Sequence, residues 1–184
     1  MNNEHIQNLL KDISSLLESS ENFDVKIKIG EEPNIKEFKA HSVILSARSA
    51  YFKTALSSQW ARKENGIIIF DKPNISPSVF EILLDYIYTG TFSDKNEVNL
   101  LDVFIAADEI ELFGISQQVK KRLLETELVW KFPEDFITIC KHDAFTNLYE
   151  TALELVCRNP RVIFESKDFL NMEEDILIRL LKCD

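Results

Sequence analysis

Alternation of apolar and polar residues, the pattern of a half-buried strand, is confined to the first part of the sequence. Residues 24–29 alternate in this way, residues 35–38 follow across the turn sequence GEEPN, and the apolar run GIIIF ends at Phe70. After that run, apolar residues recur every three or four positions as far as Leu181. The chain is therefore predicted to be α+β, with a small sheet flanked by a helical cluster and followed by an all-α rear part.

Caps and glycines predict where the helices of the front part begin and end. Ser49 is placed to cap the second of two short helices, and Ser76 followed by Pro77 begins a longer helix that Gly90 ends. Gly114 is predicted to break the apolar helical stretch that follows. A boundary near residue 128 then divides the chain into an N-terminal helix (1–20), a mixed domain (21–127) and a helical domain (128–184).

The first segment of the sequence predicts an amphipathic helix from Glu4 to Leu17. An isolated helix of this length is marginal in water, so its aliphatic stripe needs a partner surface. That surface belongs either to the same domain or to a second copy of the chain. The stripe consists of Ile6, Leu9, Leu10, Ile13, Leu16 and Leu17.

Charge and cysteine spacing limit the classes of partner. The formal charge of −10 repels nucleic-acid phosphates and anionic membrane surfaces, so neither is an expected partner. No uninterrupted apolar stretch approaches the roughly 18 residues that span a bilayer, and the N-terminus lacks the pattern of a signal peptide. Cys140, Cys157 and Cys183 are odd in number and far apart, which is typical of reduced thiols. We therefore expect a soluble protein of the cytoplasm or the nucleus.

No catalytic, cofactor-binding or metal-binding set is expected. His41 and Ser42 are adjacent, and no Gly-x-Ser-x-Gly turn accompanies them. Cys140 and His142 lack the further closely spaced ligands of a zinc site, and the four glycines are too isolated for a phosphate loop. We therefore expect a protein that is not an enzyme.

Three polar residues of the segment 38–56 are predicted to have structural roles. His41 lies where a strand passes into a helix, and one ring nitrogen can bond a backbone carbonyl. Arg48 and Ser49 are predicted to satisfy carbonyl and amide groups at helix ends.

Residues 20–127 resemble the BTB (POZ) domain, whose pattern is Asp-Val, Phe-x-Ala-His and then Leu-x-x-Arg-Ser-x-Tyr-Phe. The resemblance continues in YIYTG at residues 86–90 and in LLDVFIAADEIELFGI at residues 100–115. It implies the BTB/POZ fold and structural roles for the motif residues. The matching residues are Asp24, Val25, Phe38, Ala40, His41, Leu45, Arg48, Ser49, Tyr51 and Phe52.

Residues 159–181 resemble the beginning of a BACK domain, the helical module that commonly follows BTB, through the core Ser-x-Asp-Phe-Leu. Proteins built in this way usually continue into a longer BACK segment and then Kelch repeats or a TLDc domain. The resemblance therefore predicts a partial BACK domain over residues 128–184 and a chain that is a fragment or a truncated member.

The BTB resemblance implies that the N-terminal helix packs on a second protomer across a two-fold axis, as a homodimer. The loop of residues 56–66 is a second candidate interaction surface, where Trp60 either contacts a partner or packs under its own domain. In cullin-binding BTB proteins this loop carries an apolar residue followed two positions later by Glu, whereas here Arg62 follows Trp60. The candidate partner-binding residues are Leu56, Gln59, Trp60 and Arg62.

The function that the resemblance favours is a homodimeric BTB-BACK adaptor that links a substrate protein, of unknown identity, to a cullin-RING E3 ubiquitin ligase. The alternatives are an oligomerisation scaffold without cullin binding and a transcriptional co-regulator. BTB proteins of the repressor type pair the Asp of the first strand with an Arg directly after Ala-His. Here Asp24 is present but Ser42 occupies the Arg position.

Overall fold

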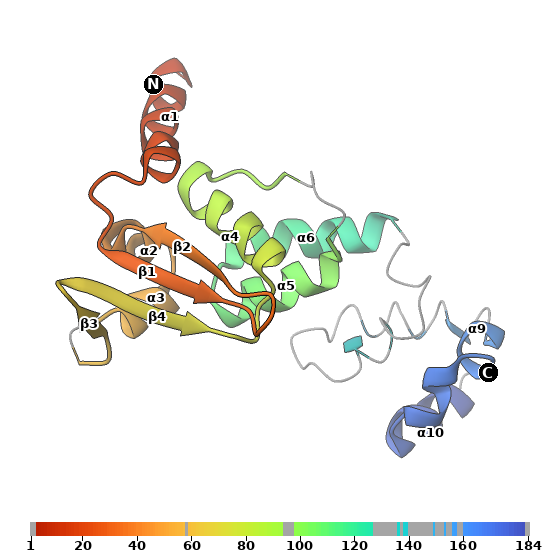
Figure 1. Ribbon diagram of the computed structural model, residues 1–184. Helices are drawn as coiled ribbons and strands as arrows, with labels where there is room; N and C mark the ends of the chain where they lie inside the picture. Colours follow the sequence, from red (N-terminus) through yellow and green to blue (C-terminus); the bar gives the residue numbers. More distant parts are fainter. Residues whose placement is uncertain are drawn as a thin grey trace. The chain divides into compact units, whose positions relative to one another are not determined.

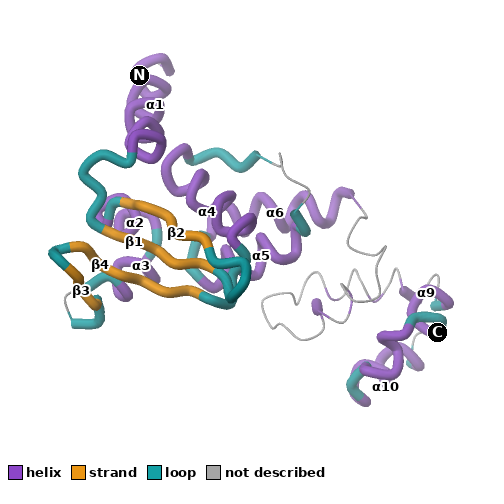
Figure 2. Tube along the Cα trace, in the orientation of Figure 1, coloured by secondary structure: helices purple, strands orange, loops and turns teal. Residues whose placement is uncertain are grey.

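The computed structural model describes residues 3–57, 59–93, 98–126 and 160–182, together with residues 136, 138, 139, 149, 153, 156 and 157. The chain divides into two compact units, Met1–Gln118 and Val119–Asp184. Figure 2 shows that all strands of the described residues belong to the first unit. The predicted domain boundary near residue 128 stays a prediction, because the division into compact units falls inside a helix.

The first unit contains a mixed four-stranded sheet in the order β2-β1-β4-β3. The two central strands, β1 (Val25–Ile29) and β4 (Ile67–Lys72), are parallel. The edge strands, β2 (Lys36–Ala40) and β3 (Arg62–Glu64), are antiparallel to their neighbours. The predicted hairpin and third strand are confirmed, and β3 is an addition that the sequence pattern did not reveal.

Alternation along β1 places one face of the sheet in the core. Val25, Ile27 and Ile29 are completely buried, whereas the two lysines between them are more accessible. The register pairs Ile27 with Phe38 of β2 and with Phe70 of β4, so one apolar layer extends across three strands. In Figure 1 the helices α2 and α3 lie behind this sheet.

Six helices of the described residues begin in the first unit, and the predicted caps at Ser49, Ser76 and Gly90 are confirmed. The N-cap Ser49 accepts a hydrogen bond from the Phe52 amide at 3.1 Å, and the N-cap Ser76 accepts one from the Val79 amide at 3.4 Å. Gly90 ends its helix in the left-handed conformation, with φ of 71°. The helices are α1 (Asn3–Ser19), α2 (Ser42–Arg48), α3 (Ala50–Ala55), α4 (Pro77–Thr89), α5 (Leu100–Glu109) and α6 (Phe113–Thr126).

The predicted break at Gly114 is wrong by one turn. The chain leaves α5 at Ile110, takes a left-handed conformation at Glu111 with φ of 55°, and enters α6 at Phe113. Gly114 therefore lies inside α6. Its lack of a side chain serves close packing, because a Cβ there would overlap with the hydroxyl oxygen of Tyr86.

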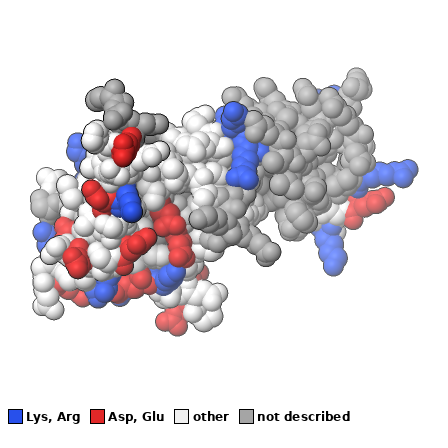
Figure 3. All heavy atoms as spheres, turned by 90° about the horizontal axis from the view of Figure 1, so that it is seen from above, with Lys and Arg blue, Asp and Glu red and all other residues white. Residues whose placement is uncertain are grey.

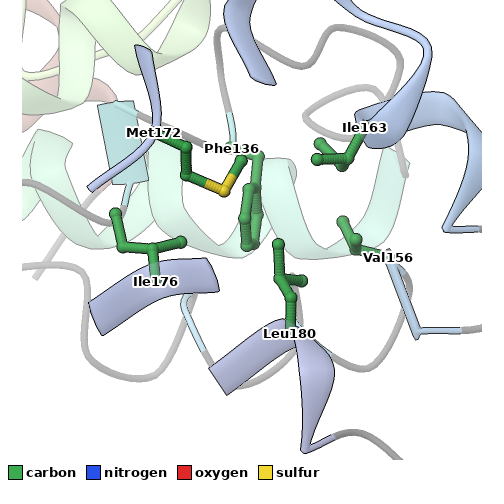
Figure 4. Close-up of a cluster of buried hydrophobic side chains, with 6 residues drawn as sticks. All are labelled: Phe136, Val156, Ile163, Met172, Ile176 and Leu180. Carbon is green, nitrogen blue, oxygen red and sulfur yellow. The ribbon is translucent and has the colours of Figure 1, made fainter. Parts of the chain in front are cut away.

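The second unit has a small hydrophobic core of its own around Phe136 (Figure 4). Besides the end of α6, its described elements are α9 (Arg161–Phe164), the 3-10 helix η3 (Lys167–Asn171) and α10 (Glu174–Leu181). The predicted helices in residues 130–143 and 147–160 lie largely outside the described residues. The core side chains that Figure 4 shows are Phe136, Val156, Ile163, Met172, Ile176 and Leu180.

The surface of the first unit carries both signs of charge. On the face seen in Figure 3, basic side chains are interspersed among acidic ones. The described residues include no helix that is long and apolar enough to cross a bilayer.

Candidate protein-interaction surfaces

Helix α1 carries an aliphatic stripe that its own protomer covers only in part. The helix packs against α4, and Ile13 and Leu17 are half-buried. Ile6 and Leu9 remain 46% and 58% exposed. The polar face of α1 shows local bonds instead, such as Ser15 Oγ donating to the Asp12 carbonyl at 2.7 Å. We name the uncovered part the exposed face of α1; it consists of Ile6, Leu9, Leu10 and Leu16.

The turn between α1 and β1 is tied to the domain through His41. Nε2 of His41 lies 2.8 Å from the carbonyl oxygen of Glu21, in the turn itself. Nδ1 lies 2.8 Å from the hydroxyl oxygen of Tyr88 in α4, which also accepts the backbone N–H of His41 at 2.9 Å. His41 is buried, at the end of β2 and the N-cap of α2. The sequence predicts the carbonyl contact, whereas the Tyr88 contact joins residues 47 positions apart and has no sequence signal.

Burial raises the pKa of Tyr88 to about 12, although the hydrogen bond from the His41 backbone acts in the opposite direction. The negative charge of Asp24 adds to the increase. The Tyr88 hydroxyl is therefore neutral at physiological pH and can serve as both donor and acceptor.

Asp24 caps α2 from outside the helix. Its Oδ1 accepts the Ser42 amide at 2.7 Å, and its Oδ2 accepts the Ser42 hydroxyl at 2.5 Å. The N-cap residue His41 makes no side-chain cap bond, since its ring is bonded to Tyr88 and Glu21. Both carboxylate oxygens of Asp24 are thus occupied inside the domain, at the position where repressor-type BTB proteins use an Asp-Arg pair.

Two further motif residues, Ser49 and Arg48, join helices of the first unit to one another. Ser49 is buried and donates its hydroxyl to the carbonyl of Ile110 at 2.7 Å, which joins α3 to the end of α5. The guanidinium of Arg48 lies 5.5 Å from the ring centroid of Tyr86, so its observed contact is with an aromatic ring rather than with a helix-end carbonyl. Ala40 is fully buried at the end of β2.

Tyr51 and Phe52 form an aromatic cluster with Phe70 of β4. The ring centroids of Phe52 and Phe70 are 5.7 Å apart, and those of Tyr51 and Phe70 are 6.2 Å apart, both with edge-to-face geometry. Lys72 lies over Tyr51 and pairs with Glu109. Burial would lower the pKa of Lys72, but its bonds to Glu109 and Tyr51 outweigh burial and raise it.

The segment 56–66 presents an exposed tryptophan. Trp60 is 75% exposed, so it does not pack under its own domain, and its amide bonds the Ser57 carbonyl at 3.0 Å. Gln59 is also exposed. Leu56, in contrast, is only 7% exposed, so the expectation that it contacts a partner is wrong; its side chain belongs to the core.

Arg62 lies on the edge strand β3 and pairs with Glu64 two residues later. The side chains of alternate residues in a strand share a face, which explains the pairing. Phe113, the first residue of α6, is 65% exposed, and the apolar pattern around it gave no indication of this exposure.

A small pocket lies between α5 and the segment that leads into α4. Its volume is about 240 Å³, less than the roughly 300–1,000 Å³ typical of sites for small molecules or cofactors. Asp102 lines it, and burial raises the pKa of that carboxyl group. Glu109 also lines it and is bonded by Lys72 and Asn74.

Cys157 forms a disulfide bond, which contradicts the prediction that it is a reduced thiol. The spacing of cysteines along the sequence does not show which of them meet in space. Cys140 and His142, considered above as metal ligands, lie outside the described residues. Among the residues that the structure does describe, no three His, Cys, Asp or Glu side chains are grouped to hold a metal ion.

The sequence matches the BTB/POZ domain family over residues 13–127. The chain belongs to the BTB/POZ domain family. The BTB domain of human Gigaxonin has a similar structure, with a TM-score of 0.53 and 26% identity over 67% of this chain and 94% of that one. The BTB domain of zebrafish PATZ1 shares the fold, with a TM-score of 0.55 and 21% identity over 68% of this chain and 97% of that one.

Relatives of this BTB protein differ in the domains that accompany BTB. Human "Zinc finger and BTB domain-containing protein 44" is 30% identical over 70% of this chain and 21% of its own length. Human "Kelch repeat and BTB domain-containing protein 4" is 28% identical over 61% of this chain and 23% of its own length. The chain thus spans about a fifth to a quarter of these relatives, and what it shares with them is a protein-interaction module.

Proposed function

We propose that this chain is a homodimeric BTB-BACK adaptor that links a substrate protein to a cullin-RING E3 ubiquitin ligase in the cytoplasm or the nucleus, and that it is not an enzyme. The observation that carries the proposal is the exposed face of α1. A partner surface is needed there because α4 covers only part of the aliphatic stripe.

A second copy of the chain can bury the aliphatic side chains of the exposed face of α1. Fully burying a leucine or isoleucine side chain contributes about 1.5–3 kcal/mol. In a two-fold symmetric dimer each burial occurs twice, because the same residues of both protomers enter the interface. Val43, at the start of α2, is also exposed and adds an aliphatic side chain to the uncovered surface of the protomer.

Trp60 supports a second interface, with the cullin. Exposed tryptophans are enriched among the residues that dominate binding energies at protein interfaces. Arg62 stands where cullin-binding relatives carry Glu, and its charge is balanced by Glu64. An approaching cullin therefore meets a paired arginine rather than a free positive charge.

The rear unit supports the BACK part of the proposal. The BACK-like core Ser-x-Asp-Phe-Leu ends in η3, and Phe169 packs against the hydrophobic cluster around Phe136. In BTB-BACK proteins, such helices extend the cullin-binding surface and set the distance to a substrate-binding domain.

Two other functions remain as alternatives. An oligomerisation scaffold without cullin binding is favoured by Arg62 in place of Glu. A transcriptional co-regulator is favoured by the zinc-finger relatives, but Ser42 already occupies both carboxylate oxygens of Asp24, the residue that would form the charged pocket of such proteins.

A calorimetric titration of the chain with the N-terminal region of the BTB-binding cullin tests the proposal. We expect saturable heat with one cullin per protomer, and loss of binding in Trp60→Ala. The matched control is Ile35→Ala, which removes another exposed apolar side chain in the turn before β2. Absence of heat at cullin concentrations on the order of tens of micromolar would contradict the adaptor function and favour the oligomerisation scaffold without cullin binding.

A further inference from the structure

Three segments that are distant in the sequence meet at His41. The turn after α1 contributes the Glu21 carbonyl, the junction of β2 and α2 contributes His41, and the last turns of α4 contribute Tyr88. Figure 1 shows the chain leaving α1 through this turn and entering the sheet at β1. We name these three residues the α1 anchor.

The contacts of the α1 anchor determine the tautomer of His41. A carbonyl oxygen only accepts, so Nε2 must carry the hydrogen that bonds Glu21. In the neutral ring Nδ1 then has a lone pair and accepts the Tyr88 hydroxyl, while that hydroxyl accepts the backbone N–H of His41. Both ring nitrogens of His41 therefore have a partner within 2.8 Å.

The turn that the anchor holds has a conformation that local sequence does not favour. Ser20 and Asn22 have φ angles of 50° and 56°, in the left-handed region that is rare for residues other than glycine. Asn adopts this conformation more often than other residues with a side chain, whereas Ser adopts it rarely. The local bonds are modest: Ser20 Oγ donates to the Leu17 carbonyl at 3.5 Å, and the Glu21 amide donates to Ser19 Oγ at 3.3 Å. The part-buried bond from His41, outside the turn, therefore adds a stabilising contact to Glu21.

The direction of α1 depends on this turn. The helix packs on α4 and is joined to the domain through the turn, and Tyr88 of the anchor belongs to α4 as well. The anchor thus joins the end of α1 to the helix on which α1 rests. A change at His41 is therefore expected to alter the angle at which the exposed face of α1 is presented, although His41 itself lies outside that face.

We infer that His41 is a positioning residue for α1, and that its Nε2 bond to Glu21 sets the helix direction required for docking a second copy of this chain. The inference rests on the proposed homodimer and adds a residue on which the affinity of that dimer depends. Dimer affinity then depends on a buried side chain that the partner copy does not touch.

Sedimentation equilibrium on the full chain tests the inference with His41→Asn and His41→Gln. The Asn amide can replace Nδ1 but does not reach Glu21, whereas the longer Gln amide can donate to the Glu21 carbonyl in the place of Nε2. We expect His41→Asn to raise the dimer dissociation constant about five- to tenfold, the change expected for one hydrogen bond. We expect His41→Gln to restore most of the affinity.

Ser49→Ala is the matched control. It removes the buried hydroxyl that bonds the Ile110 carbonyl, so it destabilises the same unit without touching the turn. We expect its dimer affinity to stay within about twofold of the wild type. Should His41→Asn fail to fold, Tyr88→Phe removes only the hydroxyl of the anchor and is expected to weaken the dimer as well.

The outcomes separate this inference from the proposed function. A dimeric wild type whose affinity changes no more in His41→Asn or Tyr88→Phe than in Ser49→Ala overturns the inference alone. The inference is also overturned if His41→Gln dimerises no more tightly than His41→Asn. The bond from Nε2 to Glu21 would then not determine the dimer affinity. A monomeric wild type overturns the proposed homodimer and the inference together.

Discussion

The hydroxyl oxygen of Tyr86 in α4 lies where a side chain on Gly114 of α6 would begin. A Cβ on Gly114 would overlap with that oxygen and would lie 3.4 Å from Cζ of the same ring. Tyr86 is buried, and its ring also contacts Arg48, so it has little room to move. The close approach of α4 and α6 therefore depends on glycine at this position.

Gly114→Ala is expected to destabilise the protein by about 1–3 kcal/mol, the usual cost of overpacking a core. The measurement is urea denaturation followed by circular dichroism. In a Tyr86→Phe background the same substitution should cost clearly less, because the overlapping oxygen is absent. Equal costs in the two backgrounds would show that the Tyr86 hydroxyl is not the obstacle.

Asp24→Ala should reduce the free energy of unfolding by about 1.5–3 kcal/mol, because it removes an ionised acceptor and leaves the Ser42 amide without its cap. Ser42→Ala removes only the hydroxyl bond and should cost less, on the order of 1 kcal/mol. Chemical denaturation of both variants gives the comparison. A greater loss in Ser42→Ala than in Asp24→Ala would contradict the capping role of the carboxylate.

Stability should decrease as the pH rises from about 10 towards 12. The folded-state pKa of Tyr88, about 12, is above the ordinary value of 10.0, so the native state holds a proton that the unfolded chain releases at lower pH. The pKa of Lys72 is also raised, and this contribution has the same sign. The full stabilisation is present below the unfolded-state values and is lost as the pH passes through the folded-state ones.

Urea midpoints measured between pH 9 and 12 test this prediction, with Tyr88→Phe as the comparison. The wild-type midpoint should fall more steeply than that of the variant, because the variant lacks one of the two groups. Parallel curves would contradict a contribution from Tyr88.

Sequence patterns predict the local features of this fold well. Residues 24–29 alternate because one face of β1 is buried, and Ser76, Pro77 and Gly90 define α4 because helix ends require specific partners. Each of these signals acts over a few residues, so it is readable without the tertiary structure. The aliphatic stripe of α1 is readable from the sequence in the same way, although the partner that covers it stays a prediction.

Features that depend on distant contacts were missed or misplaced. Gly114 suggested a helix break, but the glycine is needed because Tyr86 approaches from another helix. The loop sequence predicts Leu56 as a partner-binding residue together with its exposed neighbours, whereas its side chain is buried in the core. Strand β3 is three residues long and polar, so only its pairing with β4 defines it. The bond between His41 and Tyr88 likewise joins elements that sequence spacing does not relate.

Light scattering gives the most direct test of the central claim, that the exposed face of α1 forms a homodimer. The protomer mass is 21.3 kDa, and we expect the wild type to have twice this mass. The double variant Ile6→Asp with Leu9→Asp should be monomeric, because a dimer would bury its new charges without partners. Ser15→Asp, on the polar face of α1, adds a charge outside the interface and should remain dimeric. A wild type with the protomer mass, or a double variant that is still a dimer, would contradict the claim.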